Sequence, residues 1–148
     1  MKAWSPLRRL CAWALALALC LTPAAALPGQ AEEAPDMDLS CLSTTMMYSQ
    51  LFNILMDAEA WEGKIIRMAG QFSVWDDPDL GGLHFTCVVA DATACCFQGL
   101  DFVWAGDHPY PDAYPPEGAL ITVTGRFELY EEDGYSFVRL ADAQVEWE

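Results

Sequence analysis

The sequence predicts a mainly β domain, in which five strands close into a small barrel that is preceded by one N-terminal α-helix. Apolar and polar residues alternate over several stretches after residue 63, as they do in strands with one buried face. The segments IIRMAGQFSVW (65–75) and LITVTGRFELY (120–130) match with glycine and phenylalanine in register, and each precedes an acidic turn and a further strand. A glycine at the centre of each long strand permits the bend that a small closed sheet requires.

The first 26 residues have the three parts of a secretion signal. Lys2, Arg8 and Arg9 supply positive charge, an apolar run of about a dozen residues follows, and residues 24–26 (AAA) form a cleavage site. The apolar run is too short for a permanent membrane-spanning helix. We therefore expect a secreted or extracytoplasmic protein with no transmembrane segment after cleavage, and we leave cell-surface anchoring open.

After the signal, we predict a tether and then a single domain. Residues 27–40 are rich in Pro, Ala, Glu and Asp without apolar periodicity, which indicates a flexible acidic tether. Residues 41–148 are enough for one core and too few for two. A helix is expected first, because Ser43 or Thr44 can cap it and apolar residues then recur at helical spacing, namely Met47, Leu51, Ile54 and Leu55.

Five strands are expected after the helix. The two matched segments supply the first and fourth strands, residues 83–90 and 95–105 the second and third, and residues 135–140 the last. The residues predicted to face inward are Ile66, Met68, Phe72, Val74, Leu83, Phe85, Cys87, Val89, Leu100, Phe102, Trp104, Ile121, Val123, Phe127 and Leu129. The loop at 106–118 carries four prolines, so we expect it to be ordered but not helical. Five strands, two glycine bends and a long third connection indicate an oligonucleotide/oligosaccharide-binding (OB) barrel, a fold that serves many functions.

The charge of the chain argues against one class of partner. It has 22 acidic and 7 basic residues, a net charge of −15, and after the predicted signal only Lys64, Arg67, Arg126 and Arg139 are basic. Proteins bind nucleic acid largely by exchanging cations for Lys and Arg side chains, so we expect no nucleic-acid partner. An unknown extracytoplasmic protein, a small ligand or a cation fits the charge better.

Three cysteines within ten residues, Cys87, Cys95 and Cys96, form the candidate site. Strand alternation places Cys87 inward, and counting back from Leu100 places Cys96 inward too. One interpretation is therefore a disulfide between Cys87 and Cys96. Cys41 could instead pair with Cys95 or Cys96. A second interpretation is a site for zinc or another thiophilic metal with Cys87, Cys95 and Cys96 as ligands, although their spacing is not that of a zinc finger. A third is that the cysteines are reduced core residues.

Other residue patterns carry less chemistry. The chain has no G-x-S-x-G motif and no glycine-rich loop before a helix, and its two histidines lie on separate elements, so we do not expect an enzyme. An enzyme that uses Asp91 with neighbouring carboxylates is a further alternative. The acidic turn at 76–79 lacks the pattern of a calcium loop. Aromatic residues could serve as stacking surfaces or as core residues, namely Trp75, Trp104, Tyr110, Tyr114 and Tyr130.

At FTCVVADATACC (85–96), GLDFVW (99–104) and EGKIIRMAGQF (62–72), the chain resembles a group of small exported bacterial domains with an OB-like barrel after a short helix. It also resembles the C-terminal part of the extracytoplasmic subunit of a two-part permease family of uncharacterised function. The residues that match a cysteine-containing strand of that family are Phe85, Cys87, Ala90, Asp91 and Ala92, but Val88 stands where the family has a second cysteine. The resemblance implies fold and export, and suggests a transport-associated or cation-handling role.

We therefore predict an exported, non-enzymatic binding or accessory module, associated with a metal or a transporter. The alternative is a structural or adhesion-type domain whose cysteines form a stabilising disulfide.

Overall fold

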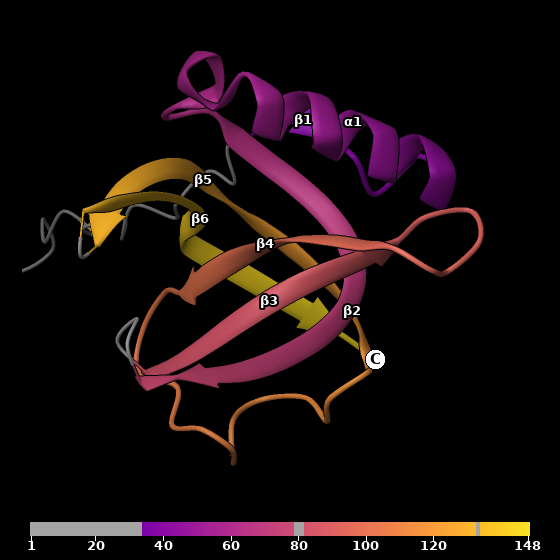
Figure 1. The fold of residues 1–148 in the computed structure, drawn as a ribbon. Helices are drawn as coiled ribbons and strands as arrows, with labels where there is room; N and C mark the ends of the chain where they lie inside the picture. Colours follow the sequence, from indigo (N-terminus) through magenta and orange to yellow (C-terminus); the bar gives the residue numbers. More distant parts are fainter. Residues whose placement is uncertain (1–33, 79–81, 133) are drawn as a thin grey trace, which may run out of the picture. The chain divides into compact units, whose positions relative to one another are not determined.

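The computed structural model describes residues 34–78, 82–132 and 134–148, and over these ranges the chain is mainly β (Figure 1). The strands are β1 (Met37–Asp38), β2 (Ile65–Asp77), β3 (Gly82–Ala90), β4 (Phe97–Trp104), β5 (Leu120–Glu132) and β6 (Tyr135–Trp147). One helix, α1 (Thr44–Met56), precedes the long strands and is followed by a short 3-10 helix, Ala58–Trp61. The predicted signal at 1–26 lies outside the described residues. No helix within the described ranges is long and apolar enough to cross a membrane.

The N-terminal segment before the helix is more ordered than a tether. Met37 and Asp38 pair in parallel with Ile66 and Arg67 of β2, and the Leu39 side chain is fully buried. The Asp36 carboxylate accepts the N–H of Ile65 at 2.8 Å. The predicted tether at 27–40 is therefore wrong for these last residues, because a two-residue strand is too short to show a periodicity; residues 27–33 lie outside the described ranges.

Helix α1 forms where its spacing predicts. The Ser43 hydroxyl caps it by accepting the N–H of Met46, and the helix ends at Met56. Met47, Leu51 and Ile54 are buried and pack into the core beside the strands. The prediction of one N-terminal helix is confirmed.

The five long strands form a continuous series of pairings. Strand β2 pairs antiparallel with β3, β3 antiparallel with β4, β4 parallel with β6, β6 antiparallel with β5, and β5 antiparallel with β2. β2 curves along its length in Figure 1 and changes partner at Gln71, which is opposite both Val88 of β3 and Leu120 of β5. The two matched sequence segments are thus neighbours that pair with each other.

Both central glycines lie where another strand approaches closely. A Cβ atom on Gly70 would lie 2.5 Å from the carbonyl oxygen of Val88 and 2.9 Å from the Cys87 Sγ. Gly125 lies where the register between β5 and β6 shifts, and a Cβ there would lie 2.9 Å from the Cβ of Leu140. These contacts give the physical reason for glycine at the two matched positions.

Alternation predicted most of the core correctly. Of the residues predicted to face inward, those that are buried are Ile66, Met68, Phe72, Cys87, Val89, Leu100, Phe102, Ile121, Val123 and Phe127. Leu83 is an exception, because it is exposed near the start of β3. The last strand does not end near Leu140 but continues to Trp147 opposite Ile121. Asp142 there has a φ of 51°, and this irregularity interrupts the alternation by which a strand is recognised.

Candidate functional site

The turn between β3 and β4 holds two of the three predicted site cysteines. It comprises residues 91–96, which we call the thiol turn, and it closes on the Ala90–Phe97 pair of the two strands (Figure 1). The N–H of Asp91 donates to the carbonyl of Cys96 at 2.9 Å, and the N–H of Ala94 donates to the carbonyl of Asp91 at 3.1 Å. Ala94 adopts a left-handed conformation with a φ of 55°, which turns the chain back toward β4.

The Asp91 carboxylate organises the thiol turn. Its Oδ1 accepts the backbone N–H groups of Thr93 at 3.1 Å, Cys95 at 3.0 Å and Cys96 at 3.4 Å, and its Oδ2 accepts the Thr93 hydroxyl at 3.0 Å. Desolvation raises the pKa of this carboxyl, but the hydrogen bonds from Thr93, Cys95 and Cys96 together lower it by more than desolvation raises it. The pKa of Asp91 is therefore below its ordinary value. Asp91 is therefore a fixed, ionised group beside two thiols.

The two thiols and this carboxylate are spaced as ligands of one metal ion. The Sγ atoms of Cys95 and Cys96 are 3.6 Å apart, and the Cys95 Sγ lies 3.5 Å from the Asp91 Oδ2. On a tetrahedral zinc ion with Zn–S of about 2.3 Å and Zn–O of about 2.0 Å, two sulfurs lie about 3.8 Å apart and a sulfur and an oxygen about 3.5 Å apart. One ligand atom from each of the three residues lies within 4.8 Å of the others. The thiol turn can thus supply three of four tetrahedral positions.

The protonation of Cys96 is set by its neighbours. A hydrogen bond with the Cys95 thiol, then desolvation, and then the negative charge of Asp91 raise the pKa of Cys96 above its ordinary value. The thiol is consequently protonated at neutral pH until a cation displaces the proton.

The structure places Cys87 apart from the vicinal pair. It is fully buried opposite Leu100 on β4, and burial raises the pKa of its thiol to about 12. Cys96 is exposed, so the prediction that it faces inward is wrong. The reason is that β4 begins at Phe97, so the alternation that places Leu100 inward does not extend to Cys96. The expected pairing of Cys87 with Cys96 is not formed, and the cysteines in the described ranges are all free.

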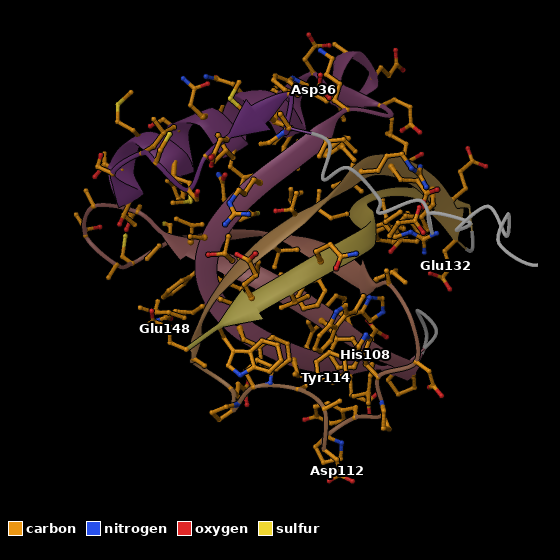
Figure 2. All side chains as sticks on the ribbon, turned by 180° about the vertical axis from the view of Figure 1, so that it is seen from behind. Asp36, His108, Asp112, Tyr114, Glu132 and Glu148 are labelled. Carbon is orange, nitrogen blue, oxygen red and sulfur yellow. The ribbon has the colours of Figure 1, made fainter. Side chains whose placement is uncertain are left out.

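The remaining sequence candidates do not join the thiol turn. Cys41 is exposed and its thiol donates to the carbonyl of Asp38 at 3.2 Å. His84 stacks on Trp75 with ring centroids 4.2 Å apart, and His108 stacks on Trp104 at 3.7 Å. Tyr114, which is labelled near His108 in Figure 2, also packs against Trp104, with ring centroids 5.2 Å apart. Of the aromatic residues singled out in the sequence, Trp104, Tyr114 and Tyr130 are half-buried and fit the core interpretation, whereas Trp75 and Tyr110 are exposed. Of the acidic turn at 76–79, Asp79 lies outside the described residues.

Sequence reasoning did not group Asp91 with Cys95 and Cys96, as the structure does, and grouped Cys87 with them instead. A signal was present, because an Asp followed two residues later by Thr in a strand connection is typical of a side chain that bonds its own backbone. Such a turn brings residue 91 back to residues 95 and 96. Neither a protein-family model nor a curated protein matches the chain.

Alkylation should separate the buried thiol from the exposed ones. We expect iodoacetamide to modify Cys41, Cys95 and Cys96 in the folded protein, and Cys87 only after denaturation, because a buried thiol with a raised pKa forms almost no accessible thiolate. Peptide mass spectrometry after timed labelling would assign each site. Rapid modification of Cys87 under native conditions would contradict its placement in the core.

Proposed function

We propose that this protein is an exported, non-enzymatic binding module that captures zinc or another thiophilic metal ion at the thiol turn. The observation that carries this function is the spacing of the Asp91 carboxylate and the Cys95 and Cys96 thiols, which suits three ligands of one tetrahedral ion. Thiolate donors select soft or borderline ions such as zinc and copper(I) over magnesium and calcium. The acidic chain, with a net charge of −15, also favours cations.

We also propose that the five long strands form an OB-like barrel. Three observations support this fold: the pairings that begin at β2 return to β2, one neighbouring pair (β4 and β6) is parallel, and glycines lie at close approaches in both β2 and β5. In this arrangement the β3–β4 turn projects from one end of the barrel. The barrel would hold the metal ligands on a rigid hairpin.

The exposure of the turn favours an accessory role rather than a structural metal site. Structural zinc sites are closed by four protein ligands, whereas the thiol turn offers three and leaves a position for water or a ligand from another molecule. An exported module of this kind suits the delivery of an ion to a transporter subunit, as the predicted secretion signal and the permease resemblance suggest. The rival function, a structural or adhesion-type domain, requires the cysteines to be oxidised and unable to bind metal.

Metal titration of the reduced protein tests this function. The affinity for the metal should also depend on pH, because the thiol ligands must lose protons when they bind it. We expect one zinc or cadmium ion per chain, with cadmium producing thiolate charge-transfer absorbance. Because the pKa of Cys96 is raised, binding must release its proton, so affinity should increase with pH by about tenfold per unit for each proton released. The increase should stop once the pH exceeds the pKa of the free Cys96 thiol.

Two results would contradict the proposal. One is the absence of stoichiometric binding by fully reduced protein, and the other is an affinity that does not change between mildly acidic and mildly basic pH. A disulfide between Cys95 and Cys96 in protein purified without reductant, together with no metal binding after its reduction, would favour the structural alternative.

A further inference from the structure

A recess lies at the opposite end of the β3–β4 hairpin from the thiol turn. The pairing between these strands stops at Thr86 and Asp101, although β3 begins four residues earlier and β4 ends three residues later. The strands therefore separate and leave a cavity of about 330 Å³, which β5, β6 and Tyr114 help to line. This volume is within the range of small-molecule sites.

The recess is charged, and its positive group is already paired. The Arg139 guanidinium donates to the Glu128 carboxylate at 2.7 Å and lies 4.4 Å from the centre of the Tyr130 ring. Asp101 lies 3.2 Å from the Nδ1 of His84. Glu132, which also lines the recess, makes no ion pair with the residues that the structure describes. The Glu132 carboxylate is thus the group whose charge is least compensated.

The pKa of the Tyr130 hydroxyl, which lines the recess, is raised above its ordinary value. Desolvation raises its pKa most, the charges of Asp101 and then Glu132 raise it further, and Arg139 lowers it by less than either carboxylate raises it. The lining of the recess agrees with this direction, because it holds two carboxylates, Asp101 and Glu132, and one guanidinium, Arg139. An anionic ligand would be repelled there, and a cation would be attracted.

The recess is lined by both rings and aliphatic side chains, but its exposed apolar residues are the aliphatic Leu83 and Val103, which favours an aliphatic ligand. Leu83 and Val103 are 47% and 49% exposed. The rings of the recess are engaged inside the domain: His84 stacks on Trp75, Phe85 on Tyr114 and Trp104 on His108, and Tyr130 contacts Arg139 and Phe137. A sugar or planar ligand would find few open ring faces, whereas a hydrocarbon chain can cover the two aliphatic side chains.

We propose that this recess binds a primary ammonium group on an aliphatic stem, with Glu132 and Asp101 facing the ammonium and Leu83 and Val103 covering the stem. Two sources carry this chemistry, a small alkylamine and a lysine side chain of a partner protein. The proposal is independent of metal binding, because none of the recess residues belongs to the thiol turn.

Binding of hexylammonium, followed by NMR chemical shifts of the purified protein, tests the proposal. Hexylammonium should bind and shift the resonances of Leu83 and Val103, whereas hexanoate and hexanol, which have the same stem, should bind at least about tenfold more weakly. Glu132→Gln should weaken hexylammonium binding about tenfold, and Glu131→Gln, which changes the neighbouring exposed acid outside the recess, should leave it unchanged. Added salt should also weaken the binding.

The outcomes separate the two sources and can overturn the proposal. A lysine amide that is acetylated on its α-nitrogen mimics a lysine side chain in a protein. If it binds, and binding is lost when its side-chain nitrogen is acetylated as well, the source is a protein partner. If hexylammonium binds and the lysine derivative does not, the source is a small amine. Hexanoate that binds as tightly as hexylammonium, or a Glu132→Gln variant that folds normally by circular dichroism and binds as the wild type does, would overturn it.

Discussion

Replacing Cys95 and Cys96 together with serine is expected to lower the affinity for zinc at least about a hundredfold. The two substitutions remove both thiolate donors, and a serine hydroxyl does not ionise at neutral pH to replace them. Competition with a chromophoric chelator under reducing conditions would measure the change. Asp91→Asn should cause a smaller loss, because the amide oxygen can still accept the turn hydrogen bonds but no longer contributes a negative charge.

The matched control is Cys41→Ser, which removes another exposed thiol that lies outside the thiol turn. This variant should bind zinc as the wild type does. Thermal unfolding of the double variant should also match that of the wild type, since Cys95 and Cys96 are exposed and contribute nothing to the buried core. An equal loss of affinity in both variants would show that zinc binds thiols without regard to the turn, and would contradict the proposed site.

Gly70→Ala is expected to reduce the free energy of unfolding by about 2 to 3 kcal/mol. The added methyl group would lie 2.5 Å from the Val88 carbonyl oxygen and 2.9 Å from the Cys87 Sγ. Val88 belongs to the strand that pairs with β2, so its carbonyl cannot withdraw without disturbing the sheet at the point where β2 changes partner. Urea denaturation monitored by tryptophan fluorescence would measure the loss.

Two further variants test the stated cause. Ser73→Ala, three residues along the same strand, should change the stability by less than about 0.5 kcal/mol. Gly70→Ala combined with Cys87→Ala relieves the contact with sulfur but not the closer contact with the backbone oxygen, so it should not restore wild-type stability. Full recovery in the double variant would show that the sulfur, rather than the Val88 backbone, excludes a side chain at residue 70.

Much of the fold could be predicted because its core residues alternate regularly. Ile66, Met68 and Phe72 in β2 and their counterparts in β5 are buried as the pattern requires, and the Ser43 cap and the spacing of Met47, Leu51 and Ile54 locate α1. The errors lie where the backbone departs from a regular period. β1 is two residues long, and β6 contains an irregularity at Asp142.

The site was predicted in part, for a related reason. Two adjacent cysteines are conspicuous in any sequence, but the third member, Asp91, is brought to them by hydrogen bonds within a turn, which leave no periodic pattern. A Cys87–Cys96 disulfide was considered because strand alternation was extended back beyond Phe97, the first residue of β4, and Cys87 was grouped with the pair as a metal ligand because it lies close to them in sequence. The recess beside Glu132 could not be predicted, because it arises where strand pairing ends and joins residues from four strands and a loop.

The thiol turn is self-contained. Its three donor groups come from six consecutive residues, and the hydrogen bonds that fix Asp91 to Thr93, Cys95 and Cys96 all stay within that segment. Residues 91–96 should therefore keep their hydrogen bonds and the spacing of Asp91, Cys95 and Cys96 when they replace the turn of an unrelated β-hairpin whose strands pair in the same way as Ala90 and Phe97 do. For the same reason, the domain should tolerate a different sequence in this turn, so that the metal preference of the proposed site could be changed without altering the strands.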